Sequence, residues 1–209
     1  MSIDKIKVKA FFKELIETVV FVIVMVILIR FFIGEIRWIP SASMHPTLLE
    51  GDRVFVERVS RFYATPHRGD IMVFYPPEEE IKTDFWSIFR RLTGFACKDI
   101  AYIKRVVGMP GDKFEVRQNS DSTYQIVIND KVLDEKYIKN NTDYIPCLKS
   151  MYCGPFVIPA GSYFMMGDNR GNSQDSRFWG FLPKERFIGR AKVLFWPVNR
   201  LKYFGLEKY

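Results

Sequence analysis

Residues Leu15–Ile33 read LIETVVFVIVMVILIRFFI, and this stretch decides how the rest of the chain is organised. Only Glu17 and Arg30 are charged, and both lie near its ends, where long side chains can reach water. A helix of this length spans about 28 Å, which is close to the thickness of the hydrocarbon layer of a membrane. The stretch therefore predicts a transmembrane helix over residues 15–33.

Two other interpretations of this stretch are a buried core helix and a cleaved signal peptide. The run Val19–Ile29 contains no polar stripe, which is unusual for a helix packed against a soluble core. The small-x-small triplet Ser41-Ala42-Ser43 lies well beyond the apolar run, which is far for a cleavage site. An uncleaved membrane anchor is therefore the favoured interpretation.

The basic residues that flank the apolar stretch predict its orientation. Lysines precede it, and arginines occur at its end and beyond, at Lys5, Lys7, Lys9, Lys13, Arg30 and Arg37. The side richer in basic residues usually stays in the cytoplasm. We therefore expect residues 1–14 to be a basic cytoplasmic N-terminus, residues 15–33 the anchor, and residues 34–209 a domain on the outer side.

Composition excludes several classes of protein. The chain has 209 residues, of which 19 are Phe and 10 are Tyr, so it has enough apolar surface for a folded core. Three Cys are too few for a disulfide scaffold, and two His without a CxxC or HExxH motif give no zinc site. The net charge of +7 is scattered and partly flanks the apolar stretch, which does not favour nucleic-acid binding. We expect no metal, no cofactor and no nucleic acid.

From residue 38 onward the pattern is typical of β-strands. Short runs alternate apolar and polar residues and are bounded by Gly, Pro, Asn or Asp, at 53–59, 71–75, 101–107, 113–117, 124–128, 161–166 and 191–196. Residues Thr83–Phe95 instead have helical spacing and basic residues, which predicts a short amphipathic helix that packs on the core or contacts a membrane. We expect a mostly β domain of short, mainly antiparallel strands after the transmembrane helix.

The cysteines suggest one further structural element. Cys147 and Cys153 are separated by five residues and could close a loop as a disulfide if the domain lies outside the cytoplasm. Cys97 is then left over, and we expect it to be a buried thiol.

Two segments contain residues that could carry chemistry. Residues 39–48, IPSASMHPTL, place small hydroxyl residues between two prolines, which predicts a stiff, non-helical loop. Composition alone favours an ordinary linker over a loop that binds a ligand. Residues 102–112, YIKRVVGMPGD, read as a strand in which Lys104 and Arg105 face opposite sides, so one cation points inward if either face is buried. A buried lysine without a carboxylate loses its charge and can act as a general base. The alternative is an edge strand with both cations in water.

A third segment, residues 166–180, reads MGDNRGNSQDSRFWG and is dense in acids, amides and arginines. Such a loop either binds a ligand or braces itself through hydrogen bonds. Neither His45 nor His67 has an acid at a suggestive spacing, so a Ser-His-Asp hydrolase is not indicated. A nucleophilic serine in this chain would need another base.

With the apolar stretch before them, the three segments resemble in order the motifs of bacterial type I signal peptidases, which are membrane-anchored Ser/Lys proteases. The matching boxes are P-S-A-S-M-x-P-T-L, Y-I-K-R-V-V-G-M-P-G-D and G-D-N-R-x-N-S-x-D-S-R-x-W-G. Residues 113–161 carry no matching motif and are expected to be the variable region. The resemblance implies an enzyme of the bacterial inner (cytoplasmic) membrane that removes signal peptides from exported precursor proteins, cutting after Ala-x-Ala.

The resemblance also implies a role for each matching residue. Ser43 would be the nucleophile and Lys104 the general base. The Ser41 hydroxyl would complete the oxyanion hole, and Ser173 would orient the lysine. Asp175 and Arg177 would form a bracing ion pair. The shallow substrate pockets would be lined by Ile39, Met44, Leu48, Tyr102 and Ile103, whereas Arg37 occupies a place where some relatives have an aromatic residue.

Two rival classes explain part of the sequence. A single-pass protein whose β domain binds a partner accounts for the apolar stretch and the strands but not for the three boxes. A Ser/Lys self-cleaving repressor is similar in its catalytic core but needs a helix-turn-helix at its N-terminus, where this chain has the apolar stretch.

Overall fold

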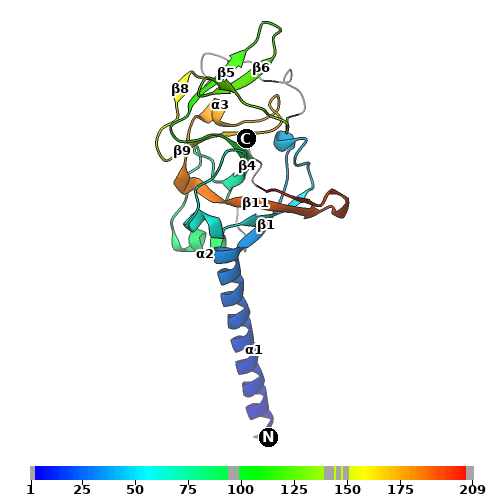
Figure 1. The fold of residues 1–209 in the computed structure, drawn as a ribbon. Coiled ribbons are helices and arrows are strands. Elements are labelled where there is room, and N and C mark those ends of the chain that lie inside the picture. Colours follow the sequence, from blue (N-terminus) through cyan, green and yellow to red (C-terminus); the bar gives the residue numbers. More distant parts are fainter. Residues whose placement is uncertain (1–2, 94–98, 139–143, 145–146, 148–150, 206–209) are drawn as a thin grey trace.

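The computed structural model describes residues 3–93, 99–138, 144, 147 and 151–205. Within these residues, a long N-terminal helix leads into a β-rich unit (Figure 1). All strand pairs described there are antiparallel. The expected mostly β architecture of short antiparallel strands behind an apolar helix is confirmed.

The N-terminal helix α1 (Ile3–Leu28) continues as a π-helical turn, η1 (Ile29–Ile33). Residues Lys7–Ile33 are long and apolar enough to cross a membrane, and none of the apolar window is buried. The buried-core-helix interpretation is therefore wrong. The helix also begins earlier than residue 15, because the Lys and Glu residues before the apolar stretch are good helix formers.

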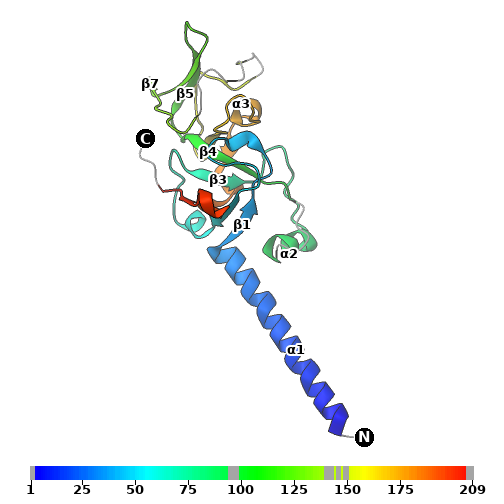
Figure 2. The ribbon, with the colours of Figure 1, turned by 90° about the vertical axis from the view of Figure 1, so that its right-hand side faces the viewer.

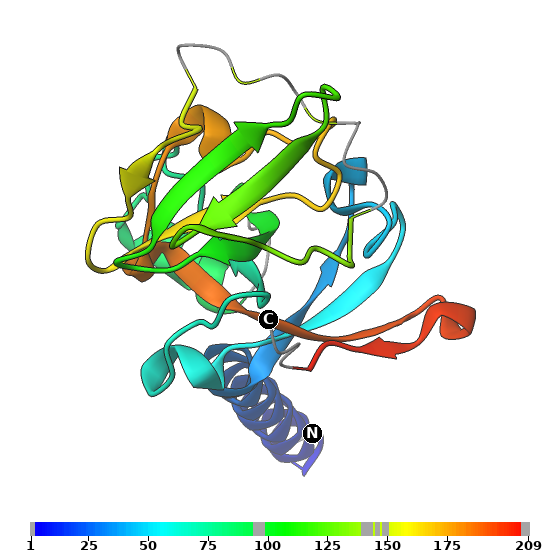
Figure 3. The same cartoon turned by 45° about the horizontal axis from the view of Figure 1, so that its top comes forward.

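The larger sheet contains the lysine segment of the sequence, and the serine segment and the polar loop connect strands of this sheet. Its strand order in the described residues is β1-β2-β11-β3-β4-β9-β10, with β12 paired to β11. The strands are β1 (Gly34–Trp38), β2 (Arg53–Glu57), β3 (Ile71–Phe74), β4 (Tyr102–Gly108), β9 (Ser162–Met166), β10 (Leu182–Pro183), β11 (Phe187–Trp196) and β12 (Lys202–Tyr203). Register shifts along β11 mark bulges, which bend a strand, and β11 crosses the unit as one long ribbon (Figure 3).

Both faces of this sheet are buried at its central strand β3. Ile71 and Val73 of β3 pack into one apolar cluster with Met44 and Leu48. Met72 and Phe74 of the same strand pack into another cluster, together with Val106, Tyr163 and Phe187. This division follows from the alternation of side chains along a strand. Strands β3 and β4 therefore lie in the interior of the unit, and most of their side chains are buried.

The expected variable region forms a smaller sheet at the end of the molecule far from α1 (Figure 1). Its strand order in the described residues is β7-β6-β5-β8, with β5 (Lys113–Gln118), β6 (Tyr124–Ile128), β7 (Lys131–Val132) and β8 (Phe156–Val157). Phe114 is fully buried there, and its ring lies 4.2 Å from that of Phe164. Cys147 and Cys153 form a disulfide, as the spacing suggested. Cys97 lies outside the described residues.

Helix α2 (Phe85–Thr93) lies beside the point where α1 enters the domain (Figure 2). Asp84 caps it by accepting the backbone N–H of Ser87 at 3.0 Å. Phe85 and Trp86 are 73% and 64% exposed, and no side chain described in α2 is fully buried, so the helix does not pack into the core. On another element, η3 (Val59–Phe62), the Phe62 ring lies 5.9 Å from that of Phe31.

Candidate active site

The serine segment folds as a single tight turn, η2 (Ala42–Met44), which follows extended residues. The side chains of Met44 and Leu48 are fully buried, and the Leu48 N–H donates to the Met44 carbonyl at 3.0 Å. These two apolar anchors fix the turn against the core. Ser43 directly precedes Met44 in the sequence and is 9% exposed, so its hydroxyl has a defined place next to β4.

Lys104 and Arg105 of β4 are both buried, with exposures of 5% and 3%. The edge-strand alternative is therefore wrong, because β4 lies between β3 and β9. Arg105 forms a bidentate ion pair with Asp168, at 2.8 Å and 2.6 Å. Lys104 takes part in none of the ion pairs among the described residues. Its Nζ lies 2.7 Å from the Ser43 Oγ.

Burial sets the protonation of this amine. Desolvation lowers the pKa of Lys104 from 10.5 to about 8, although the nearby carboxylates of Asp175 and Asp168 oppose the shift. Arg177 adds to it. A substantial fraction of Lys104 is therefore neutral just above neutral pH, and a neutral amine can accept the proton of a hydroxyl at this distance.

Ser41 stands at the solvent side of the pair. Its side chain is exposed, and its Oγ lies 3.4 Å from the Ser43 Oγ. The structure therefore brings Ser41, Ser43 and Lys104 together. Of these three, Ser41 is the one whose side chain is exposed to solvent. The part of Ser41 in an oxyanion hole stays a prediction.

Gly167 brings the third motif against the serine turn. A Cβ at this position would lie 2.4 Å from the Ser43 carbonyl oxygen and 2.2 Å from the Ser173 Oγ, so only glycine fits. The Ser173 hydroxyl is buried near the Asp175 carboxylate, whose pKa it helps to lower, but it forms no hydrogen bond of normal geometry among the described residues. The expected hydrogen bond from Ser173 to Lys104 is thus not formed here, because the hydroxyl lies against Gly167 and Asp175.

Asp175 and Arg177 form an ion pair, and both are fully buried. Two nitrogens of Arg177 donate to the two carboxylate oxygens, each at 2.9 Å. Burial favours the neutral acid, but the charge of Arg177 and the hydrogen bonds that the carboxylate accepts together outweigh it and lower the pKa of Asp175. Asp175 also caps the short helix α3 (Ser176–Trp179) and accepts the Gly167 N–H at 3.1 Å. The pair therefore joins α3 to the glycine beside Ser43.

Further contacts between the motifs involve residues that the sequence did not single out. Asn169 donates from its side chain to the Ala42 carbonyl at 3.1 Å, and from its backbone to the Ser43 carbonyl at 3.1 Å. Thr47 donates to Asp168 at 2.5 Å, which links the serine segment to the partner of Arg105. The only sequence signal for these contacts was the density of polar residues in the third segment.

The expected pocket residues are mostly part of the core. Exposure is 2% for Ile39, zero for Met44 and Leu48, and 9% for Ile103. Tyr102 is partly exposed, and its ring centre lies 5.6 Å from the Lys104 Nζ. Their role as pocket walls stays a prediction. The Arg37 guanidinium pairs with Glu35, with 2.6 Å between Nε and Oε1.

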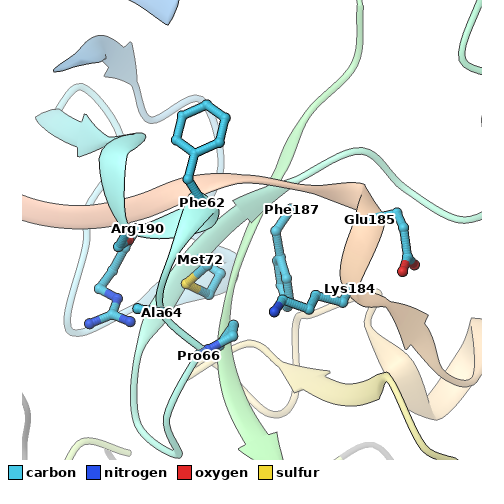
Figure 4. A pocket seen from close by; sticks show the side chains of 9 residues that line it. Phe62, Ala64, Pro66, Met72, Lys184, Glu185, Phe187 and Arg190 are labelled. Atoms are coloured by element: carbon cyan, nitrogen blue, oxygen red, sulfur yellow. The ribbon is translucent and has the colours of Figure 1, made fainter. Parts of the chain in front are cut away.

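A separate hollow of about 380 Å³ opens between η3, β3 and β11 (Figure 4). Phe62, Met72 and Phe187 are among its apolar lining residues, and the basic residues Lys184 and Arg190 flank it. Met72 is the cross-strand partner of Lys104, but neither Lys104 nor Ser43 lines the hollow. The hollow is therefore distinct from the place where the hydroxyl and the amine meet.

A buried serine hydroxyl in contact with a buried amine, in a mostly β domain, is the arrangement that a serine endopeptidase with a lysine base requires. Comparison with known proteins gives the family. The sequence model described as signal peptidase, peptidase S26, matches residues 12–196. The chain belongs to this family of signal peptidases, which remove signal peptides from precursor proteins.

Several relatives are similar over most of the chain. It is 42% identical to signal peptidase I of Leptolyngbya laminosa, over 92% of this chain and 83% of that protein. It is 32% identical to signal peptidase I S of Bacillus subtilis, over 97% of this chain and 98% of that protein. A crystal structure of a signal peptidase I from Enterococcus faecalis aligns with a TM-score of 0.41 and 24% identity, over 60% of this chain and 96% of the other.

The close approach at Gly167 generates a testable prediction. Replacing Gly167 with Ala should lower precursor cleavage at least 100-fold, because the added methyl group displaces the Ser43 carbonyl or Ser173. The measurement is the rate of cleavage of a labelled precursor by full-length protein. The control is Gly205→Ala, where the nearest atom to the new methyl group is 3.5 Å away. Equal activity of the two variants would contradict the tight contact at Gly167.

Proposed function

We propose that Ser43 is the nucleophile and Lys104 the general base of this signal peptidase. The observation that carries the proposal is the 2.7 Å contact between the Ser43 Oγ and an amine that is 5% exposed. Lowering the pKa of Lys104 from 10.5 to about 8 corresponds to roughly 3 kcal/mol of differential solvation. The fold supplies this energy, because Lys104 lies in an interior strand.

In the proposed reaction, neutral Lys104 takes the proton of Ser43 as the oxygen attacks the scissile carbonyl. The Ser41 hydroxyl and the backbone N–H of Ser43 donate to the oxygen that becomes negative, and each such donor is worth about 3 kcal/mol in related hydrolases. The protonated Lys104 then gives its proton to the leaving amine. Water, activated by the same amine, releases the acyl group from Ser43.

We also propose that the enzyme cuts after small residues, in the pattern Ala-x-Ala. The side chains around Ser43 are large and already committed to the core, among them Met44 and Ile103. Little room therefore remains for a bulky side chain next to the scissile bond. The proposed substrates are exported precursor proteins.

We further propose that α1 anchors the enzyme in the bacterial cytoplasmic membrane as a single span, with residues 1–14 in the cytoplasm and the β-rich unit outside. Residues Lys7–Ile33 span about 40 Å as a helix, which is sufficient for the hydrocarbon layer and one interface. The exposed rings of Phe85 and Trp86 lie beside the end of this helix, and aromatic side chains favour the membrane interface. Helix α2 would therefore contact the membrane surface rather than the core.

Substitution of the two reacting residues tests the proposed mechanism. Ser43→Ala and Lys104→Ala should each lower cleavage of a labelled precursor at least 1,000-fold, because no nucleophile or no base remains. The matched control is Lys113→Ala, which removes a lysine that is 54% exposed and paired with Asp130. Folding of each variant is checked by circular dichroism. Cleavage by a folded Ser43→Ala variant would overturn the assignment.

The pH dependence of cleavage tests the protonation of Lys104. Below its pKa the ammonium cannot accept a proton, so kcat/KM should rise about tenfold per pH unit and level off above a midpoint near 8. The rate should be measured between pH 5 and 10, with tryptophan fluorescence as the check that the fold persists. A flat profile over this range would argue against a lysine base.

Charges within α1 test the membrane anchor. The full-length chain should stay with membranes during alkaline carbonate extraction. Replacing both Val22 and Val26 with Arg should release it, because each Arg near the centre of a span costs about 2.5–3.5 kcal/mol. The control variant carries Leu at both positions. Extraction of the unaltered chain by carbonate would show that α1 does not span the bilayer.

A further inference from the structure

Arg170 is the third buried arginine near the catalytic pair, and it is 2% exposed. A buried guanidinium is stable only if carboxylates or other acceptors satisfy it. Its Nη1 donates to Glu135 Oε2 at 2.9 Å, its Nη2 donates to Glu135 Oε1, and Tyr144 supplies another contact. Among the ion pairs of the described residues, Glu135 is the one acid that pairs with Arg170.

Glu135 belongs to the part of the chain that carries no family motif. It follows β7 of the smaller sheet, and its side chain is 6% exposed. The Glu135 carboxylate therefore links this region to the polar motif of residues 166–180. The contact therefore joins the expected variable region, residues 113–161, to the loop that contains the third motif, residues 166–180.

Arg170 transmits this contact toward Ser43. Its Nε donates to the Gly167 carbonyl at 2.9 Å, and its own carbonyl accepts a nitrogen of Arg177 at 2.9 Å. Gly167 in turn abuts the Ser43 carbonyl so closely that a methyl group cannot fit between them. A shift of Arg170 would therefore displace the backbone that bounds the serine turn.

A second series of contacts connects Glu135 with Arg105, the neighbour of Lys104. The Tyr137 hydroxyl donates to Glu135 Oε1 at 2.7 Å, and the Arg105 guanidinium lies 3.9 Å from the centre of the Tyr137 ring. Arg105 is the neighbour of Lys104 in β4 and holds Asp168. One short segment, residues 135–137, therefore contacts both arginines that flank the reacting groups.

From these contacts we propose that Glu135 is a positioning residue for the Ser43–Lys104 pair. This proposal rests on the proposed function of Ser43 and Lys104. Glu135 touches neither reacting group; it acts by fixing Arg170 against Gly167, and by holding Tyr137 beneath Arg105. The motif-free region thus contributes to catalysis through one carboxylate, and the two sheets are coupled at the active site.

The test is Glu135→Gln in the full-length protein, with kcat and KM measured separately on a labelled precursor at pH 9. The variant keeps the shape of the side chain but leaves the Arg170 charge unpaired. We expect kcat to fall at least tenfold while KM stays within twofold. The matched control is Glu115→Gln, which removes a partly exposed carboxylate paired with Arg117 on the same smaller sheet and should leave both constants unchanged.

A folded Glu135→Gln variant with kcat within twofold of the unaltered enzyme would overturn the proposal. If that variant fails to fold, Tyr137→Phe decides, because it removes the hydrogen bond to Glu135 but keeps the ring beneath Arg105. We expect a two- to fivefold lower kcat at constant KM, and an unchanged kcat would overturn the proposal. Retained cleavage by Ser43→Ala would instead contradict the assignment of the nucleophile, so the two failures are distinguishable.

Discussion

The structure of the site depends on one desolvated amine held 2.7 Å from one hydroxyl. An amine in water stays protonated until about pH 10 and cannot take a proton from serine at neutral pH. Placing Lys104 in β4, between two other strands, removes the water that would stabilise its charge. The sheet, the serine turn and the polar loop all serve to keep that amine dry and within reach of Ser43.

Charge pairing around the site explains why this lysine, and not a neighbouring cation, becomes neutral. Arg105 has Asp168, Arg177 has Asp175 and Arg170 has Glu135, so each of these buried arginines has its own carboxylate. Among the described residues, the Lys104 Nζ has the Ser43 hydroxyl as its hydrogen-bond partner and no carboxylate. Because a guanidinium stays protonated even when buried, the fold satisfies the arginines and leaves the lysine to lose its proton.

Alternation and turn residues predicted the long strands well. The expected run over residues 124–128 coincides with β6, and those for β2, β3, β4, β5 and β9 differ by only one or two residues at their ends. The run over residues 191–196 covers only the second part of β11, which begins at Phe187. The strands β7, β8, β10 and β12 were missed because each has two residues, too few for a pattern. β1 was missed because it has only five residues, which directly follow the apolar helix. Its pairing with β2 is a tertiary contact that this short stretch of sequence does not indicate.

The sequence by itself determined the apolar helix, the mostly β class and the candidacy of Ser43 and Lys104, because these depend on local periodicity and on motifs. It could state only that Lys104 or Arg105 must face inward. Tertiary structure decided that both are buried, that Asp168 neutralises Arg105, and that Glu135 reaches Arg170 from a region without motifs. Burial and charge pairing are collective, since each depends on segments far apart in the chain, and no local pattern of residues specifies them.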